Sequence, residues 1–176
     1  MTSKPKAFLL HGFLGAGKTT FAKRLEMDQD AVRFTHDEWM ARLYGDDPPA
    51  ELFQAYARRV SEVMEETWIR CLQLGTNVVL DFGFWSRAER RRVRAVAASH
   101  GAVAILYRLN CSEDVAWARI AERNKRLAGN LYVAPNTFQV LKARFEPLHE
   151  DEDRIEIGGE KPSTQQPARP GAHEPR

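Results

Sequence analysis

Eight residues near the N-terminus constrain the fold of this 176-residue chain more than any other feature. They match the pattern G-x-x-x-x-G-K-[ST] without a substitution, as Gly12-Phe13-Leu14-Gly15-Ala16-Gly17-Lys18-Thr19. The apolar run Ala7–Leu10 precedes the pattern and indicates a buried strand, and the residues from Thr20 to Glu26 indicate a helix. A strand, a glycine-rich turn and a helix in this order predict a phosphate-binding loop and disfavour a chance glycine turn.

The predicted loop has the chemistry of an anion site. Its glycines, at positions 12, 15 and 17, allow several backbone N–H groups to face one point, and the start of the following helix adds partial positive charge there. Lys18 can reach the β- and γ-phosphates of a nucleotide, and the Thr19 hydroxyl can bind Mg²⁺. We therefore expect the eight loop residues, together with Thr20, to bind ATP with Mg²⁺.

Length and composition limit the class of protein. Hydrophobic residues make up 43% of the chain and charged residues 28%, which are values typical of a globular domain. No apolar run approaches the ~20 residues of a membrane span, and the first six residues lack the apolar core of a signal peptide. Cys71 and Cys111 are far apart and in no metal-binding spacing, which favours reduced thiols in the cytoplasm. A net charge of +2 is too small to indicate a nucleic-acid partner.

Strand-like and helical segments alternate along the chain, which predicts an α/β fold with helices on both faces of a parallel sheet. The expected strands are Ala7–Leu10, Val32–Thr35, Val78–Leu80, Val103–Leu109 and Ile155–Ile157. A helix is expected from Leu52 to Leu74, with a buried stripe of Leu52, Tyr56, Val60, Val63, Met64 and Cys71. Another is expected from Arg87 to Ser99, with Val93, Val96 and Ala97 on its inner face. Residues 1–157 thus form one domain, and the proline-rich residues 158–176 are expected to be disordered.

Two carboxylates follow predicted strands at the sheet edge where ligands bind in open α/β folds. Asp37 directly follows His36 at the exit of the second strand and can accept a proton from an acceptor hydroxyl during phosphoryl transfer. It could instead cap a short helix from Glu38 to Leu43. Asp81 ends the third strand, the usual place of a carboxylate that supports Mg²⁺. The letters D-F-G at 81–83 do not indicate a protein kinase, since the other kinase motifs are missing.

Arginines recur on two predicted helices. Arg119, Arg123 and Arg126 are spaced by four and three residues, so they share one helix face that could contact phosphate. A solvated basic face paired with Glu113 or Glu122 is the alternative. The run from Arg87 to Arg94 indicates a solvated face, although an arginine at its start could contact an anion.

The motifs and their order resemble a family of small P-loop kinases. The phosphate loop, the His36-Asp37-Glu38 step, the segment Asp81 to Trp85 followed by arginines, and the helix with Arg119 and Arg123-Asn124 recur in zeta toxins, chloramphenicol phosphotransferase and the kinase half of polynucleotide kinase. The chain looks most like bacterial kinases labelled AAA-family ATP-binding proteins, over residues 6–157. The resemblance implies a P-loop NTPase three-layer α/β/α fold with a five-stranded parallel sheet in the order 2-3-1-4-5. It also implies that Asp37 is the base and that the helix around Arg119 to Arg126 is a lid over ATP. Ala41-Arg42 departs from the polynucleotide kinases, whose basic acceptor-binding residue lies closer to the Asp.

Together these features predict an ATP- and Mg²⁺-dependent phosphotransferase that acts on a hydroxyl of a small molecule in the cytoplasm. The catalytic residues would be Lys18, Asp37 and Arg123, the nucleotide site would include Arg119 and Arg123, and the metal ligands would be Thr19 and Asp81. The acceptor is expected between Asp37, the segment from Tyr44 to Phe53, and Phe84-Trp85. Two alternatives remain, a 5′-hydroxyl kinase of nucleic acid and an ATP-binding switch protein.

Overall fold

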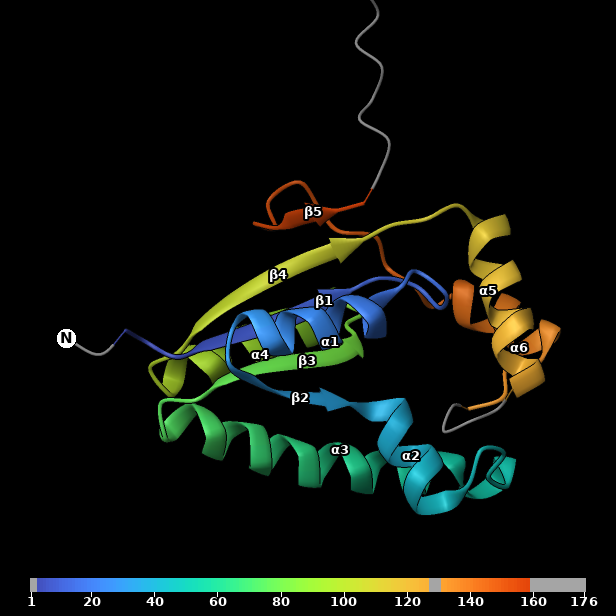
Figure 1. The fold of residues 1–176 in the computed structure, drawn as a ribbon, viewed down its shortest axis with the longest axis horizontal. Helices are drawn as coiled ribbons and strands as arrows, with labels where there is room; N and C mark the ends of the chain where they lie inside the picture. Colours follow the sequence, from blue (N-terminus) through green and yellow to red (C-terminus); the bar gives the residue numbers. More distant parts are fainter. Residues whose placement is uncertain (1–2, 127–130, 159–176) are drawn as a thin grey trace, which may run out of the picture.

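A computed structural model describes residues 3–126 and 131–158. Five strands form one parallel sheet in the order β2-β3-β1-β4-β5 (Figure 1). Their bounds are Lys6–His11 for β1, Ala31–Thr35 for β2, Asn77–Gly83 for β3, Val103–Leu109 for β4 and Ile155–Ile157 for β5. The α/β fold class, the five strands and their order are as predicted. The proline-rich stretch from residue 159 onward lies outside the described residues, so its expected disorder stays a prediction.

The sheet has a hydrophobic core on each face because successive strand residues point to opposite sides. Phe8 and Leu10 of β1 pack in the cluster that includes Ala22 and Leu25 of α1 (Lys18–Asp28). Leu9 faces the other way, into a larger cluster that is covered by α3 (Ala50–Gln73) and α4 (Arg87–Ser99). Figure 1 shows the resulting layers, with α1 and α3 along the sheet.

The buried stripe of α3 differs in part from the predicted one. Val60 and Met64 are buried as expected, and Trp68, at only 1% exposure, continues the stripe although the predicted set left it out. Val63 is 54% exposed and Leu52 is also exposed, so both were assigned wrongly. Each residue turns a helix by about 100°, so the buried residues, which are four positions apart, stay on one face, whereas Val63 lies about 100° from Met64 and leaves that stripe.

Three shorter helices stand near the ends of the strands, where Figure 1 places α5 and α6 beside each other and α2 next to α3. They are α2 (His36–Tyr44), α5 (Glu113–Arg126) and α6 (Pro135–Lys142). Ile120 of α5 and Phe138 of α6 form a third apolar cluster, against which Phe13 and Leu14 of the glycine-rich loop pack. This packing fixes α5 and α6 beside that loop. Within the described part of the chain, no helix has the length and apolar character that crossing a membrane requires.

Candidate active site

The glycine-rich loop connects β1 to α1 and lies close against α5. Gly15 has a φ of +75°, and a Cβ at this position would lie 2.4 Å from the carbonyl oxygen of Ala116. Gly17, with a φ of +91°, is the N-cap residue of α1, so Lys18 and Thr19 open that helix. The loop geometry therefore needs glycine at both positions, and it brings α5 into direct contact with the site.

Two cations already bind carbonyl groups of this loop. Lys18 Nζ donates a hydrogen bond to the Phe13 carbonyl at 2.9 Å, and Arg119 Nη1 donates one to the Gly15 carbonyl at 3.1 Å. Burial lowers the pKa of Lys18, and the carboxylates of Asp81 and Asp37 act in the opposite direction. Both positive charges are thus held where phosphate oxygens would meet the loop.

Thr19 and Asp81 meet beside the loop. Thr19 Oγ1 donates to Asp81 Oδ2 at 2.7 Å, and Thr35 Oγ1 donates to the same oxygen at 3.3 Å. Burial raises the pKa of Asp81, and Lys18 and the hydrogen bond from Thr19 lower it in part. A hydroxyl beside a buried carboxylate is a donor set that suits Mg²⁺, which takes one or two protein carboxylates and completes its shell with water and phosphate. The described residues contain no group of three His, Cys, Asp or Glu that could hold a metal by itself.

Asp37 is the second residue of α2, so the helix-cap interpretation is wrong: the helix begins at His36 and its N-cap is Thr35. His36 Nε2 donates to the Ala57 carbonyl at 3.1 Å, and its Nδ1 lies 3.9 Å from Asp37 Oδ1. Burial alone would raise the pKa of Asp37, but the charges of His36, Lys18 and Arg123 lower it overall. Asp37 is therefore a carboxylate at neutral pH.

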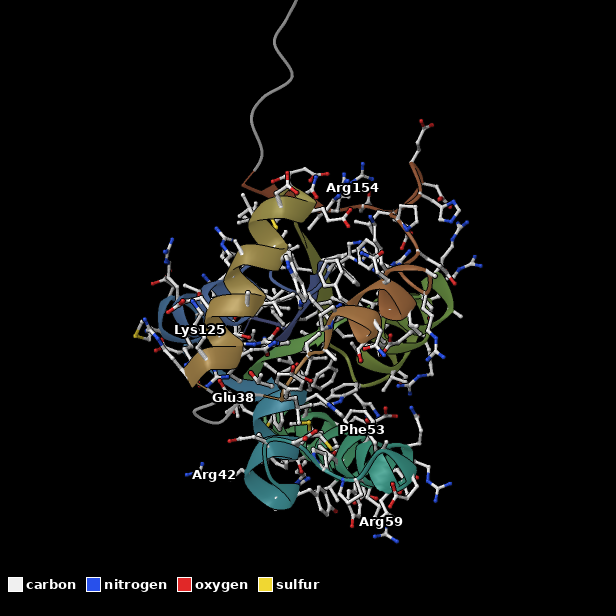
Figure 2. All side chains as sticks on the ribbon, turned by 90° about the vertical axis from the view of Figure 1, so that its right-hand side faces the viewer. Glu38, Arg42, Phe53, Arg59, Lys125 and Arg154 are labelled. Atoms are coloured by element: carbon white, nitrogen blue, oxygen red, sulfur yellow. The ribbon has the colours of Figure 1, made fainter. Side chains whose placement is uncertain are left out.

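The neighbouring carboxylate is engaged elsewhere. Glu38 forms ion pairs with Arg33 at 2.9 Å and with Lys23 at 3.7 Å. Figure 2 shows Glu38 on α2 and Arg42 pointing outward from the same helix. Of the two acidic residues after β2, Asp37 alone lines the cavity beside the glycine-rich loop.

The three arginines predicted to share one face of α5 divide into two groups. Arg119 and Arg123 line the cavity, whereas Arg126 pairs with Glu122 at 3.0 Å. The solvated-face alternative therefore describes Arg126, and the phosphate-contact interpretation fits the other two. Arg123 Nε is buried, and among the described residues it has no hydrogen-bond partner, which leaves its donor available to a ligand.

The arginine run of α4 contains a residue that the sequence interpretation missed. Arg90 is 0% exposed and forms two hydrogen bonds of 2.7 Å with Glu152, which is 8% exposed. It lies three residues before the buried Val93, and this helical spacing was the signal that could have placed it inside. Arg87 pairs with Asp151 instead of lining the cavity.

Arg90 holds the turn that follows β3. Its Nη1 donates to the carbonyl of Phe84 at 3.0 Å, and His11 Nδ1 donates to the same carbonyl at 3.0 Å. Phe84 has a φ of +47°, which is uncommon for a bulky residue. Trp85, next in the turn, donates from Nε1 to the Gly12 carbonyl at 3.2 Å. The turn is thereby fixed against the glycine-rich loop.

These elements enclose a cavity of about 940 Å³ at the carboxyl ends of the strands, the end that Figure 2 views. From the predicted nucleotide and metal sites, the residues that line it are Leu14, Gly15, Gly17, Lys18, Thr19, Thr20, Asp81, Arg119 and Arg123, and Gly12, Phe13 and Ala16 shape the loop without lining the cavity. From the predicted acceptor region, Asp37, Asp46, Asp47, Phe53 and Trp85 line it. Phe84 is buried in the core and Tyr44 stacks on Tyr56, so neither forms a wall of the cavity.

Comparison with known folds agrees with this geometry. Among solved structures, a candidate kinase from Chloroflexus aurantiacus has 20% sequence identity and a TM-score of 0.71, with 88% of each chain covered. A gluconokinase from Sinorhizobium meliloti has 15% identity and a TM-score of 0.58, with 88% of this chain and 82% of that one covered. A chain of the Pnkp1/Rnl/Hen1 RNA repair complex has 22% identity and a TM-score of 0.62 over 83% of this chain, which spans 48% of that longer one. Identities this low establish the fold alone.

No curated protein matches the sequence significantly. A family model does match: the model of an AAA domain covers residues 8–148, which include the glycine-rich loop, both strand-end carboxylates and the arginines of α5. The chain therefore belongs to this AAA-domain family and has the nucleotide-binding fold of the small P-loop kinases.

Proposed function

We propose that the protein is an ATP- and Mg²⁺-dependent phosphotransferase that moves the γ-phosphate to a hydroxyl group of a small molecule. The observation that carries this proposal is the position of Asp37. Its carboxylate lines the same cavity as Lys18 and Thr19 and does not cap its helix. A nucleotide switch needs only a positioned water, whereas a kinase needs a carboxylate beside the acceptor hydroxyl.

The roles of the residues follow from their surroundings. Lys18, Arg119 and Arg123 would bind phosphate oxygens and stabilise the charge that spreads over the transferred group. Thr19 and Asp81 would hold Mg²⁺, which when bound offsets phosphate charge. The charges of His36, Lys18 and Arg123 keep the pKa of Asp37 low, so that Asp37 is ionised and able to accept a proton.

In the proposed transfer, every bond that forms or breaks and the proton that moves can be assigned. The acceptor oxygen forms a bond to the γ-phosphorus while the bond from that phosphorus to the bridging oxygen breaks, and the electron pair leaves with ADP. The hydroxyl proton passes to the Asp37 carboxylate and then to solvent.

We infer a cytoplasmic location for this activity, and the free cysteines Cys71 and Cys111 agree with it.

The variant Asp37→Asn tests the proposal, with Glu38→Gln as the matched control on the adjacent residue. Phosphate transfer would first be found by screening sugars, nucleosides, hydroxylated antibiotics and 5′-hydroxyl oligonucleotides for ADP release. Asp37→Asn should then lower transfer by roughly 10²–10⁴-fold, the usual contribution of a general base. Affinity for an ATP analogue, measured by isothermal titration calorimetry, should stay near the original value in both variants.

Each alternative has its own outcome in this experiment. Equal transfer rates in Asp37→Asn and the unchanged protein would remove Asp37 from the mechanism. ATP hydrolysis that no acceptor class stimulates, and that Asp37→Asn leaves unchanged, would identify a switch protein. Phosphorylation of oligonucleotides in preference to small molecules would identify the nucleic-acid kinase.

A further inference from the structure

The side chains that line the cavity separate by charge. Its lysine and arginine residues, within the described part of the chain, are Lys18, Arg119 and Arg123, and all belong to α1 or α5. The carboxylates other than Asp81 come from different elements: Asp37 from α2, the pair Asp46 and Asp47 from the connection between α2 and α3, and Glu89 from the first turn of α4. We call the lining from α1 and α5 the nucleotide end of the cavity, and the lining that contains Asp37, Asp46, Asp47 and Glu89 its acidic end.

Within the described residues, His36 also lines the cavity, and its charge acts on Asp37 and Glu89. No ion pair within 4 Å joins Asp46, Asp47 or Glu89 to a cation of residues 3–126 or 131–158. The arginine whose charge acts most on Glu89 is Arg92, which is bound through both of its terminal nitrogens to Glu65 at 2.7 and 2.8 Å. Burial raises the pKa of Glu89, and the charges of Arg92, Arg90 and His36 lower it in part; of these three residues, only His36 lines the cavity. A positive ligand group would relieve this excess of negative charge.

Aromatic rings stand among these carboxylates. Phe53, Phe82 and Trp85 all line the cavity. The face of such a ring attracts an ammonium group, most strongly where water is displaced. A protonated amine is attracted both by aromatic rings and by carboxylates. A phosphate or carboxylate group of a ligand would be repelled there, because it carries the same charge as the carboxylates of the protein.

We propose that the acceptor is a hydroxyl compound that carries a protonated amine, an amino alcohol or an amino sugar, held by Asp46, Asp47 and Glu89 while its hydroxyl faces Asp37. This inference rests on the proposed phosphotransferase function and names its substrate class. The site itself is defined by the cavity and the phosphate loop, and the carboxylates determine which acceptor fits it. The same charges act against sugar acids and nucleic acids, whose groups are anionic.

Binding is the first test, because it does not depend on turnover. The probes are matched sets of compounds that differ only in charge, such as glucosamine, glucose and glucuronate, together with an amino cyclitol and its parent cyclitol. Isothermal titration calorimetry on the full chain saturated with a non-hydrolysable ATP analogue and Mg²⁺ gives each affinity. An amine member should bind about tenfold to hundredfold more tightly than its neutral parent, and the acid should bind most weakly.

Variants then test the named residues. Asp46→Asn combined with Asp47→Asn, and separately Glu89→Gln, should reduce the preference for the amine at least about tenfold. Asp28→Asn is the matched control, because Asp28 is an exposed carboxylate at the end of α1 that does not line the cavity. Affinity for the ATP analogue should be equal in all of these proteins, which shows that the nucleotide end is intact.

The two proposals fail in different ways. If neutral or acidic members bind as tightly as the amines, or if no amine binds, the cationic acceptor is refuted whatever the enzyme does with ATP. If amines bind selectively but ADP release with phosphate transfer is never seen, the proposed phosphotransferase function is refuted and the acidic end remains an amine-binding site. An unchanged amine preference in both acidic-end variants would refute the assignment of these residues.

Discussion

Replacing Glu152 by glutamine should lower the free energy of unfolding by about 3 kcal/mol, because the change leaves the Arg90 guanidinium charged and buried. The lowered pKa of the Glu152 carboxyl group gives this magnitude. The hydrogen bonds from Arg90 hold the pKa of Glu152 at about 2, against an ordinary value of 4.5. That difference corresponds to about 3 kcal/mol at about 1.4 kcal/mol for each pH unit. In a domain of this size the expected loss in melting temperature is about 6–12 °C.

The assay is urea unfolding followed by far-ultraviolet circular dichroism. Asp151→Asn is the matched control. Asp151 precedes Glu152 and pairs with Arg87, but its side chain is 66% exposed, and such surface ion pairs contribute about 1 kcal/mol or less to the free energy of unfolding. Arg90→Met should be at least as harmful as Glu152→Gln, because it leaves the Glu152 carboxylate buried without its partner and removes one donor each from the carbonyls of Phe84 and Trp85. If Glu152→Gln costs no more than Asp151→Asn, the reasoning about this buried pair is refuted.

Two further predictions concern the phosphate loop and its neighbour His11. Lys18→Ala should lower nucleotide-dependent turnover by about 10²-fold or more while keeping the unfolding midpoint, because Lys18 faces developing phosphate charge; unchanged turnover in a steady-state assay would contradict the site assignment. Burial lowers the pKa of His11 from 6.5 to about 4. Between pH 4 and pH 6.5 the unfolded chain therefore binds a proton that the folded protein does not bind. The free energy of unfolding should therefore fall as the pH drops from 6.5 to 4. Urea titrations across this range should show that the free energy of unfolding depends less on pH in His11→Asn than in the unchanged protein. An equal dependence on pH in the two proteins would exclude His11 as the cause.

The fold could be predicted from local patterns because each element carries its own signal. The apolar run before Gly12 and the alternation of strands and helices were sufficient for the sheet, and the family resemblance supplied its strand order. The stripe of α3 was harder to assign, since Val63 and Trp68 are both apolar and only the phase of the helix decides which one is buried.

The candidate site was predictable where one motif contains the chemistry. Lys18, Thr19 and Asp81 follow from the phosphate loop and a strand end, and the structure brings all three to one cavity. Arg90 was not recognised because its partner Glu152 lies 62 residues later, and a run of arginines looks solvated without that partner. No sequence pattern distinguished Asp46 and Asp47, since acidic residues are ordinary in a connection between helices. Only the fold brings them to the cavity that the lysine and arginines also line.

The bond between Arg90 and Glu152 also joins parts of the chain that are synthesised at different times. During synthesis the chain emerges from its N-terminus, so the phosphate loop and the turn at Phe84 exist before the carboxylate that fixes this turn. The ordering cost of bringing such distant residues together is met only near the end of the chain, when β5 also completes the sheet. A nascent chain that ends before Glu152 contains the whole phosphate loop but lacks the carboxylate that pairs with Arg90, the residue that holds the turn at Phe84 and Trp85. The phosphate loop is thus synthesised well before the contact that fixes the turn beside it.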